Sequence, residues 1–510
     1  MNPVFGIHVG NSRACLAVCK QDDSKFSVEV IANNAGDRVM PAIVTVTETE
    51  NVVGAACKSL MITRWNATVT SNKYMLNKDS PESPSNGKRK VATEMRDGEV
   101  CYSIPLDGRT DYVTPTEIAT CIYHSLFDIA RSAVPGVEGD ISCVLMVPKH
   151  FSEAARFKVR TAAESVGWDV LHIINEPAAT LLGFNMLSEK VPPPAQTVLV
   201  YRVGGRSCDA TVIDLTHGMI SVLDTEHSEE VGGKLLISTL TKYLGEEFYR
   251  KYKLDPKESH RSWTKLSLAA EDCLHVLSTI ESANCFVESL CDGVDLSYTM
   301  SRARLDSLLF PFLPNFARPL HTVLARLNLS PDNVSTVLLC GGLLKVPRLK
   351  KFISDIFQES SSKILSLPTG VNYDEVLACG AARQAGYIAV DKLGDSFLPN
   401  EIDIPTLEFP LIFQVEGAEC ESLQLETGQP LPLHRTLTLS SCTELVTISA
   451  TQFESDQITL RGQLQLQNLE STTQLQFEID SENGIKVGIT EGPEVVRHHT
   501  IKMFSSPNLL

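Results

Sequence analysis

The sequence has 510 residues, of which 43% are hydrophobic and 21% charged, and its formal net charge is −17. This length exceeds what a single hydrophobic core supports, so roughly two to four domains are expected. The acidic charge argues against a general nucleic-acid-binding protein, because phosphate backbones repel such a surface, and no direct DNA contact is predicted.

The sequence begins without a recognisable targeting signal. Met1–Phe5 lead directly into a predicted strand, which leaves no room for the charged and apolar regions of a signal peptide. No apolar run of about 18 residues predicts a membrane-spanning helix. The 14 cysteines therefore indicate reduced thiols of the cytosol or nucleus. Because no C-x-x-C pair is present, no metal site is predicted.

Two distant segments share the pattern of one phosphate-binding hairpin. They are Ile7–Leu16 (IHVGNSRACL) and Tyr201–Ala210 (YRVGGRSCDA), aligned on Gly10 and Gly204. Each is an apolar strand, a tight turn and a second apolar strand, and such a turn directs backbone N–H groups into a concavity that can hold phosphate. An ATPase of this design is expected to carry aspartate two residues before the glycine, where it holds Mg²⁺ and its waters. His8 and Arg202 occupy these places, which favours ATP binding without fast hydrolysis.

Strands and helices alternate from residue 1 to about residue 390, which predicts an α/β architecture with helices covering the sheets. The predicted strands include Ser142–Val147, Thr197–Val203 and Val337–Cys340, and the predicted helices include Pro115–Ala133, Ser152–Ser165, Lys234–Lys251 and Pro347–Ile356. The repeated hairpin indicates two related lobes, about 1–190 and 191–390, with a ligand between them. Residues 80–90, which hold the basic run Lys88–Lys90, and the proline-rich residues 191–195 are predicted loops.

The residue pattern changes after Phe409. Gln457–Leu469 and Gln474–Thr490 alternate apolar and polar residues with period two, which is typical of antiparallel strands with one buried face. Asn483 and Gly484 predict a tight hairpin turn between two of these strands. Residues 406–510 are therefore predicted to form a small antiparallel β-sandwich domain. Residues 391–405, rich in proline, aspartate and glycine, are predicted to be the linker.

With these features in order, the chain resembles the Hsp70 chaperones of the actin/hexokinase ATPase superfamily. The resemblance rests on Gly6–Val18, Asn33–Ala42, Ile173–Ala179, Val198–Ile213, Val337–Pro347, Asp374–Ala382, Gly428–Pro432 and Phe477–Thr490. It implies a two-lobed nucleotide-binding domain over residues 1–390, followed by a β domain like that which binds substrate. An Hsp70 of full length continues into a helical lid, whereas this sequence ends shortly after the last hairpin. No lid is therefore expected, and stable capture of a client peptide by this chain alone is not expected.

The resemblance also implies the site residues. Lys73, Glu176 and Asp209 match family positions that arrange the γ-phosphate, the attacking water and the Mg²⁺ shell, and they are the residual catalytic residues. The implied ATP-binding residues are Gly10, Asn11, Ser12, Arg13, Arg202, Gly204, Gly205, Arg206, Ser207, Glu271, Ser278, Gly341, Gly342, Lys345 and Asp374. Among them, Asn11 and Arg13 replace hydroxyl-type residues of the family, and Arg206 replaces a glycine.

These departures predict a site with more positive charge and fewer oxygen ligands for Mg²⁺. Arg202 and Arg206 can hold phosphate through charge-assisted hydrogen bonds of about 1.5–3 kcal/mol each. They do not place a water nucleophile as a hydrated metal ion does. ATP is therefore expected to bind, with Mg²⁺ dispensable, and to be hydrolysed slowly. The alternative is that both arginines point to solvent and the cleft holds no nucleotide.

A short Hsp70 with an altered catalytic cleft resembles the atypical Hsp70 subunit of the eukaryotic ribosome-associated complex. That resemblance implies a cytosolic cochaperone that forms a heterodimer with a zuotin-type J-protein. The pair would activate a conventional Hsp70 that handles nascent chains at the ribosome. A slow but genuine J-protein-stimulated ATPase is the second interpretation, because Lys73, Glu176 and Asp209 are retained. An actin-like or nucleotide-exchange module is the third.

Overall fold

The computed structural model describes most of the chain: residues 3–22, 25–81, 91–134, 141–186, 196–216, 219–392, 411–418, 420, 422–425, 433–443, 445–454, 457–467, 469, 472–479, 485–491 and 495–501. The chain divides into two compact units, Met1–Phe397 and Leu398–Leu510. Among the described helices, none combines the length and the apolar character that a bilayer crossing requires.

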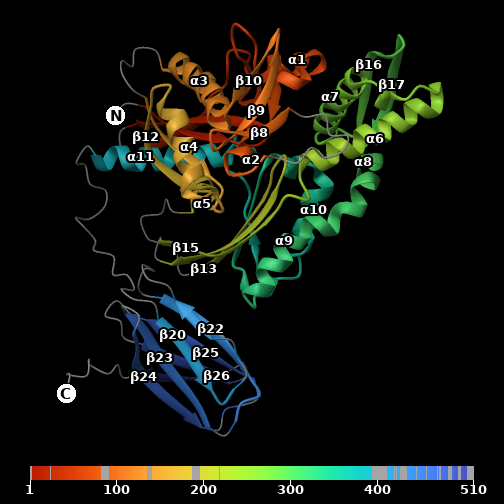
Figure 1. Ribbon diagram of the computed structural model, residues 1–510. Coiled ribbons are helices and arrows are strands. Elements are labelled where there is room, and N and C mark those ends of the chain that lie inside the picture. Colours follow the sequence, from red (N-terminus) through yellow and green to blue (C-terminus); the bar gives the residue numbers. More distant parts are fainter. Residues whose placement is uncertain are drawn as a thin grey trace. The chain divides into compact units, whose positions relative to one another are not determined.

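Two sheets of identical strand order form the centre of the first unit (Figure 1). The order is β3-β2-β1-β11-β12 in one sheet, where β4 also pairs with β2, and β15-β14-β13-β18-β19 in the other. The first sheet consists of β1 (Val4–Val9), β2 (Arg13–Asp22), β3 (Lys25–Val30), β4 (Val39–Pro41), β11 (Ile141–Val147) and β12 (Trp168–Asn175). The second consists of β13 (Gln196–Val203), β14 (Cys208–Thr216), β15 (Met219–Ser228), β18 (Thr336–Cys340) and β19 (Lys363–Ile364). We call residues 3–186 lobe I and residues 196–375 lobe II.

The strand directions are repeated as well. In lobe I, β1 pairs antiparallel with β2 and parallel with β11. In lobe II, β13 pairs antiparallel with β14 and parallel with β18. The hairpins β1–β2 and β13–β14 therefore hold equivalent places in two sheets of one topology.

Helices cover both sheets, and several begin at the signals that the sequence carries. Their bounds are α1 (Cys57–Thr63), α2 (Asn72–Leu76), α3 (Pro115–Ala133), α4 (Glu153–Glu164), α5 (Glu176–Gly183), α6 (Gly233–Tyr252), α7 (His260–Leu277), α8 (Arg302–Leu309), α9 (Leu313–Arg326), α10 (Pro347–Asp355) and α11 (Val376–Lys392). At the start of α3, the Thr114 hydroxyl accepts from the Glu117 N–H, and the Glu117 carboxylate accepts from the Thr114 N–H. This reciprocal cap satisfies two backbone donors that a helix end leaves free. The predicted Pro115–Ala133 helix is confirmed, and the other three predicted helices differ by one residue at one or both ends.

Small β elements extend both lobes. In lobe I they are β5 (Ile43–Thr45), β6 (Val52–Val53), β7 (Thr68–Thr70), β8 (Ala92–Arg96), β9 (Glu99–Leu106) and β10 (Arg109–Val113). In lobe II, β16 (Ser282–Cys291) and β17 (Val294–Ser301) form a two-stranded sheet next to α7.

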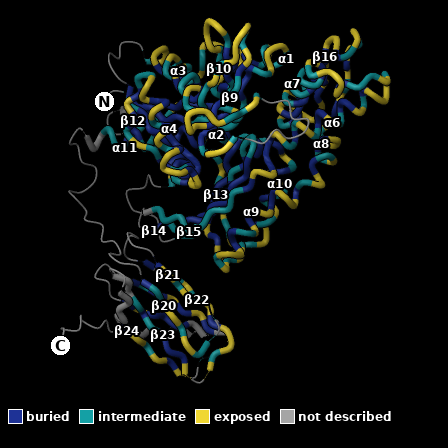
Figure 2. Tube along the Cα trace, viewed as in Figure 1, coloured by how far each residue is buried: buried dark blue, intermediate teal, exposed yellow. Residues whose placement is uncertain are grey.

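Apolar residues of both lobes share one core around α5 and α11. This cluster includes Val4 and Ala17 of the first sheet, Val198 and Ile213 of the second, and Ala381 of α11. Figure 2 shows the buried strands at the centre of the unit and the exposed residues at its surface. Because one hydrophobic cluster joins both sheets, the lobes are held together by burial of apolar area.

The crossing of α5 and α11 is close enough to require glycine. A Cβ atom on Gly380 would overlap the backbone of Ala179 and Gly183. We expect Gly380→Ala to lower the free energy of unfolding by about 1–3 kcal/mol, because the overlap forces a backbone shift. Urea denaturation followed by tryptophan fluorescence measures this change.

A second helical glycine provides the control. Gly245 lies in α6, and a Cβ atom there would meet only side chains, the nearest being the Trp263 ring at 3.2 Å. Gly245→Ala is expected to be neutral or to stabilise the helix by up to about 1 kcal/mol. Equal effects of the two substitutions would contradict the close crossing.

The second unit contains two four-stranded antiparallel sheets, β21-β20-β23-β24 and β22-β25-β26-β27. Their strands are β20 (Leu411–Glu416), β21 (Leu423–Leu425), β22 (Leu433–Ser440), β23 (Leu445–Glu454), β24 (Gln457–Gln467), β25 (Thr472–Ile479), β26 (Ile485–Glu491) and β27 (Val495–Ile501). Side chains of both sheets form one core, in which the Phe413 and Phe477 ring centroids are 4.4 Å apart. In β25, Leu475, Phe477 and Ile479 are buried and the residues between them are not, as the period-two pattern predicts.

Several sequence predictions fall on residues that the structure does not describe. These are the turn at Asn483–Gly484, the basic run Lys88–Lys90, the segment Gly428–Pro432, residues 191–195 and linker residues 393–405. One boundary is corrected, because Asp391 and Lys392 belong to α11 rather than to the linker. The helix continues because the apolar residues of α11 pack on the first sheet for most of its length.

Candidate functional site

The two predicted hairpin turns have the same hydrogen bond. The Gly10 N–H donates to the Arg13 carbonyl at 2.8 Å, and the Gly204 N–H donates to the Ser207 carbonyl at 2.9 Å. The turns face each other across the lobes, because a Cβ atom on Gly205 would overlap the Ser12 hydroxyl. Gly205 is therefore needed for the close approach of the two turns.

A buried ionic cluster lies beside these turns and contains all three residues of the predicted catalytic set. The Lys73 ammonium donates to Glu176 Oε1 at 2.6 Å, and Arg202 Nε lies 2.9 Å from Glu176 Oε2. Arg202 also donates to the Asp209 carboxylate. His8 Nε2 is 3.7 Å from Glu176 Oε1. Arg202 thus lies between two carboxylates that belong to different lobes.

The charges of this cluster compensate one another. Burial raises the pKa of Glu176, but Arg202, Lys73 and His8 outweigh it and hold that pKa well below its usual value. Burial also raises the pKa of Asp209, and Arg202 and His227 lower it on balance. Both carboxyl groups are therefore ionised and paired with cations of the protein itself.

The alternative in which both arginines point to solvent is wrong for Arg202. Its side chain is 13% exposed and contacts both acids. Arg202 occupies this position because it lies directly opposite Asp209 in the β13–β14 pairing, so both side chains are on one face of the sheet.

Two histidines that the sequence analysis missed complete the cluster. His227 lies opposite Asp209 in the β14–β15 pairing, and its Nδ1 is 2.5 Å from Asp209 Oδ1. His150 follows β11 in lobe I, and its ring centroid is 4.0 Å from that of His227. The Asp209 carboxylate raises the pKa of His227 by more than burial lowers it. The sequence carries no signal for either histidine, because His227 reaches Asp209 through a register shift and His150 comes from the other lobe.

Asn11 fixes the position of Lys73. The Asn11 side-chain oxygen accepts from the backbone N–H of Tyr74, at 2.9 Å. This bond ties the first turn to α2, the short helix that carries Lys73. Ser207 contributes a hydroxyl 3.2 Å from the Arg202 guanidinium.

Several other predicted ATP-binding residues form a second group of contacts between the lobes. Arg13 donates to Asp374 at 3.3 Å and lies 2.6 Å from His275 Nε2, and Lys345 donates to Asp374 at 2.8 Å. Glu271 lies 3.4 Å from Lys58 of α1 and 3.6 Å from His275.

Three further predicted ATP-binding residues lie at the end of α7 and in the turn that follows β18. The Ser278 hydroxyl donates to the Leu274 carbonyl at the end of α7. Gly341 has φ +97°, and a Cβ atom there would overlap the Val203 backbone. Gly342 lies next to Asp374. Among the described residues, therefore, α7, the Gly341–Gly342 turn and the first hairpin converge through Arg13 and Asp374.

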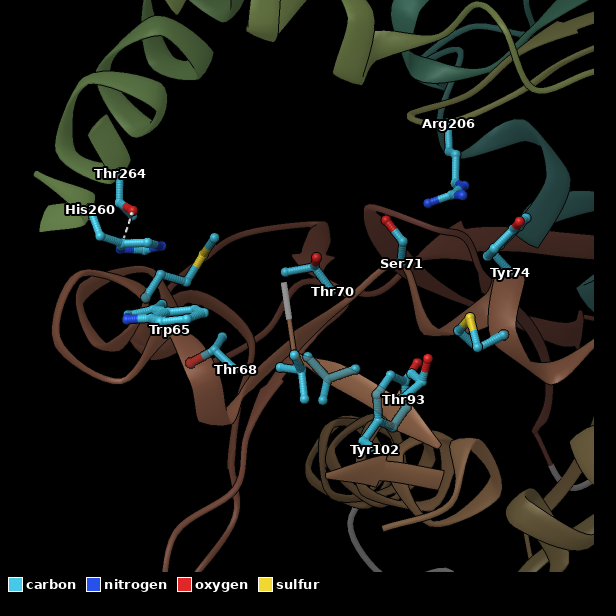
Figure 3. Close-up of a pocket in the computed structure, with 14 residues that line it drawn as sticks. Trp65, Thr68, Thr70, Ser71, Tyr74, Thr93, Tyr102, Arg206, His260 and Thr264 are labelled. Atoms are coloured by element: carbon cyan, nitrogen blue, oxygen red, sulfur yellow. Dashed lines mark hydrogen bonds between the residues drawn. The ribbon is translucent and has the colours of Figure 1, made fainter. Parts of the chain in front are cut away.

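A pocket of about 100 Å³ opens between the lobes and extends from the second turn (Figure 3). At one end the Arg206 guanidinium lies 3.6 Å from the centroid of the Tyr74 ring. At the other end the Trp65 and His260 rings stack with centroids 4.5 Å apart. Of the predicted ATP-binding residues, only Arg206 is in its lining, so the pocket adjoins the second turn and contains none of the other predicted ATP-binding residues.

The residues present fit a polyphosphate better than they fit Mg²⁺. Two glycine-containing turns that face each other and the cations Arg202, Arg206 and Lys73 are suited to phosphate oxygens. Mg²⁺ requires oxygen ligands in octahedral geometry. In this structure, nitrogen-bearing side chains occupy two expected ligand positions, and Glu176 and Asp209 are already paired. The donor set therefore does not fit a Mg²⁺ shell.

Comparison with known proteins identifies relatives over most of the chain. Residues 4–405 match the family described as Hsp70 protein. The chain is 33% identical over 459 residues to "Heat shock 70 kDa protein 14" of Danio rerio, an alignment that covers 89% of this chain and 88% of the relative. The proteins of the same name from Mus musculus and Homo sapiens are 32% and 31% identical, and each alignment covers 89% of this chain and 87% of the relative.

Proposed function

This chain belongs to the Hsp70 family, and we propose that it is an atypical member that binds ATP and hydrolyses it slowly. The observation that carries this proposal is the position of Arg202 between Glu176 and Asp209. A fixed guanidinium neutralises the charge that a metal ion would otherwise neutralise. It supplies no coordinated water, so it supports binding more than hydrolysis.

In this proposal the triphosphate of ATP lies between the two turns. The N–H groups of the Gly10–Arg13 and Gly204–Ser207 turns and the cations Arg202 and Arg206 would hold these oxygens. Arg13, Lys345 and Asp374 would contact the nucleoside side together with Glu271 and Ser278 of α7. Mg²⁺ is dispensable for this binding, since the protein provides the positive charge itself.

Titration calorimetry with ATP, in excess EDTA or in MgCl₂, tests this proposal. We expect a saturable heat in both buffers, with dissociation constants that agree within about threefold. The reason is that protein cations, which are present in both buffers, replace the metal. Absence of binding in both buffers would remove the proposal, and binding only with Mg²⁺ would show that the metal is required.

We further propose that the chain acts as a cytosolic cochaperone with a J-protein partner. In this role it forms a heterodimer with a zuotin-type J-protein at the ribosome, and the pair activates a conventional Hsp70 that keeps nascent chains folding-competent. In this role the first unit binds the J-protein in a nucleotide-dependent manner. The second unit is a β-sandwich like the Hsp70 substrate-binding domain. Purification from native cytosol should recover a J-protein in equal amount, and recovery of the chain alone would count against this role.

A second candidate function is a slow, J-protein-stimulated ATPase. The observation that favours it is the buried contact of 2.6 Å between Lys73 and Glu176, which preserves a lysine at the phosphate end of the site. In that case a J-protein should stimulate phosphate release, and Lys73→Ala should reduce the stimulated rate at least about tenfold, the usual effect of removing a transition-state contact. Lys345→Ala, which removes a cation from the nucleoside side, is the comparison variant.

A further inference from the structure

We propose that His150, Asp209 and His227 bind a divalent transition metal ion of the zinc type. One ligand atom from each residue lies within 4.8 Å of the others. Two imidazoles and one carboxylate are a donor set that zinc prefers and Mg²⁺ does not. No short motif connects these residues, which is why the sequence predicted no metal site.

The geometry needs only a small adjustment to enclose an ion. Bonds of about 2 Å from zinc to nitrogen and oxygen place two ligands of a tetrahedral ion roughly 3.3 Å apart. The ligand atoms of the cluster lie within 4.8 Å of one another, so the widest separation has to close by at most about 1.5 Å. Asp209 Oδ1 and His227 Nδ1, which lie 2.5 Å apart on adjacent strands, have to separate by about 0.8 Å. The largest movement falls to His150, which follows β11 and is exposed.

The surroundings of the cluster suit a metal site. His227 Nε2, the nitrogen that does not face Asp209, lies 3.7 Å from Glu229 Oε1. Histidine ligands of metals commonly donate their second N–H to such a carboxylate, which fixes the ring. Arg202 contacts Asp209 Oδ2, whereas Asp209 Oδ1 faces His227 Nδ1. A metal ion bound by Oδ1 and Nδ1 would replace the proton that these two atoms share, since metal binding releases protons from its ligands. Three protein ligands leave a fourth position for water or another ligand.

The ion would connect the two lobes. His150 belongs to lobe I, whereas Asp209 and His227 belong to the second sheet. Anything that binds the folded state alone stabilises it. Zinc is therefore expected to raise the unfolding temperature of the first unit, and it would do so without nucleotide. This inference is independent of the proposed ATP binding, so the two can fail separately.

The test uses the full chain without an affinity tag, reduced with a phosphine and free of nucleotide. Zinc is titrated against a chromophoric chelator, and Co²⁺ is added as a spectroscopic probe. We expect one equivalent of zinc and a visible Co²⁺ spectrum of tetrahedral type without a strong thiolate charge-transfer band. His150→Ala and His227→Ala should each weaken zinc binding at least about tenfold. Loss of a residue that only hydrogen-bonds to a metal ligand already lowers metal affinity by about that factor, and these two residues are ligands themselves. Both should also lose the zinc-dependent rise in unfolding temperature.

Two controls keep the outcome decisive. The double variant His498→Ala/His499→Ala removes the adjacent histidine pair near the end of the chain and should bind zinc as the unmodified chain does. If His227→Ala does not fold, as judged by circular dichroism, His227→Gln and His150→Ala carry the test. Unchanged affinity in the His150 and His227 variants would overturn the proposal. So would a thiolate-type Co²⁺ spectrum or the absence of stoichiometric binding.

Discussion

Replacing Glu176 with glutamine is expected to lower the free energy of unfolding of the first unit by about 3–5 kcal/mol, the usual cost of breaking a buried ion pair. Glu176 is 3% exposed and Lys73 is 6% exposed. Glutamine keeps the size of the side chain but not its charge. Lys73 would then lose its carboxylate partner, and Arg202 would keep only Asp209.

Urea denaturation followed by tryptophan fluorescence measures this loss, because Trp65, Trp168 and Trp263 all lie in the first unit. Glu164→Gln is the matched control. Glu164 is an exposed acid on α4 that pairs with Arg160 at 3.1 Å. Its replacement should change stability by no more than about 0.5 kcal/mol. Similar effects of the two substitutions would mean that Glu176 does not balance the buried cations.

Replacing Arg202 with alanine is expected to cost a similar amount, about 3–5 kcal/mol, and to create a response to Mg²⁺. Without the guanidinium, Glu176 and Asp209 would be two buried carboxylates with less positive charge between them. A hydrated Mg²⁺ ion, which prefers carboxylate oxygens, could then replace the missing charge. We therefore expect MgCl₂ to raise the unfolding temperature of Arg202→Ala but not that of the unmodified chain.

Arg202→Lys separates charge from geometry in this experiment. Lysine retains a positive charge but does not reproduce the planar fork that contacts both acids. It should lose less stability than alanine and show no response to MgCl₂. Equal stabilisation of all three proteins by MgCl₂ would contradict the conclusion that Arg202 replaces the metal.

The hairpins illustrate what residue pattern alone can predict. Gly10 and Gly204 lie between apolar strands at the same spacing, and turn formation is local, so both turns were identified before the structure. The position of Arg202 at the metal end of the site followed from the same alignment. The pattern did not predict the contact of Arg202 with Glu176, because Glu176 belongs to the other lobe.

His227 shows why the rest of the site was not predictable. Counting back from the Thr216–Met219 pair would place Glu226 opposite Asp209. A one-residue bulge between Val212 and Ile213 shifts the register and places His227 there instead. Such a shift exchanges the side chains on each face of a strand. Strand register does not predict the position of His150, because His150 follows β11 of lobe I and lies in no strand that pairs with β14 or β15.

Local residue patterns predict the two hairpin turns, four of the described helices, the alternating strands of the second unit and the Hsp70 resemblance, with His8 and Arg202 in place of two acids. These depend on local spacing and side-chain type, which can be read along the chain. Folding of the chain is what brings Lys73, Glu176, Arg202 and Asp209 into one compensated cluster, Arg13 to Asp374 and His275, and two histidines to Asp209. The Lys73–Glu176 and Arg202–Asp209 contacts each lie within one lobe, and packing of the lobes joins the two pairs through Arg202 and Glu176. The Arg13 contacts also cross between the lobes, and the His227–Asp209 contact depends on a bulge. Local spacing along the chain contains neither kind of information.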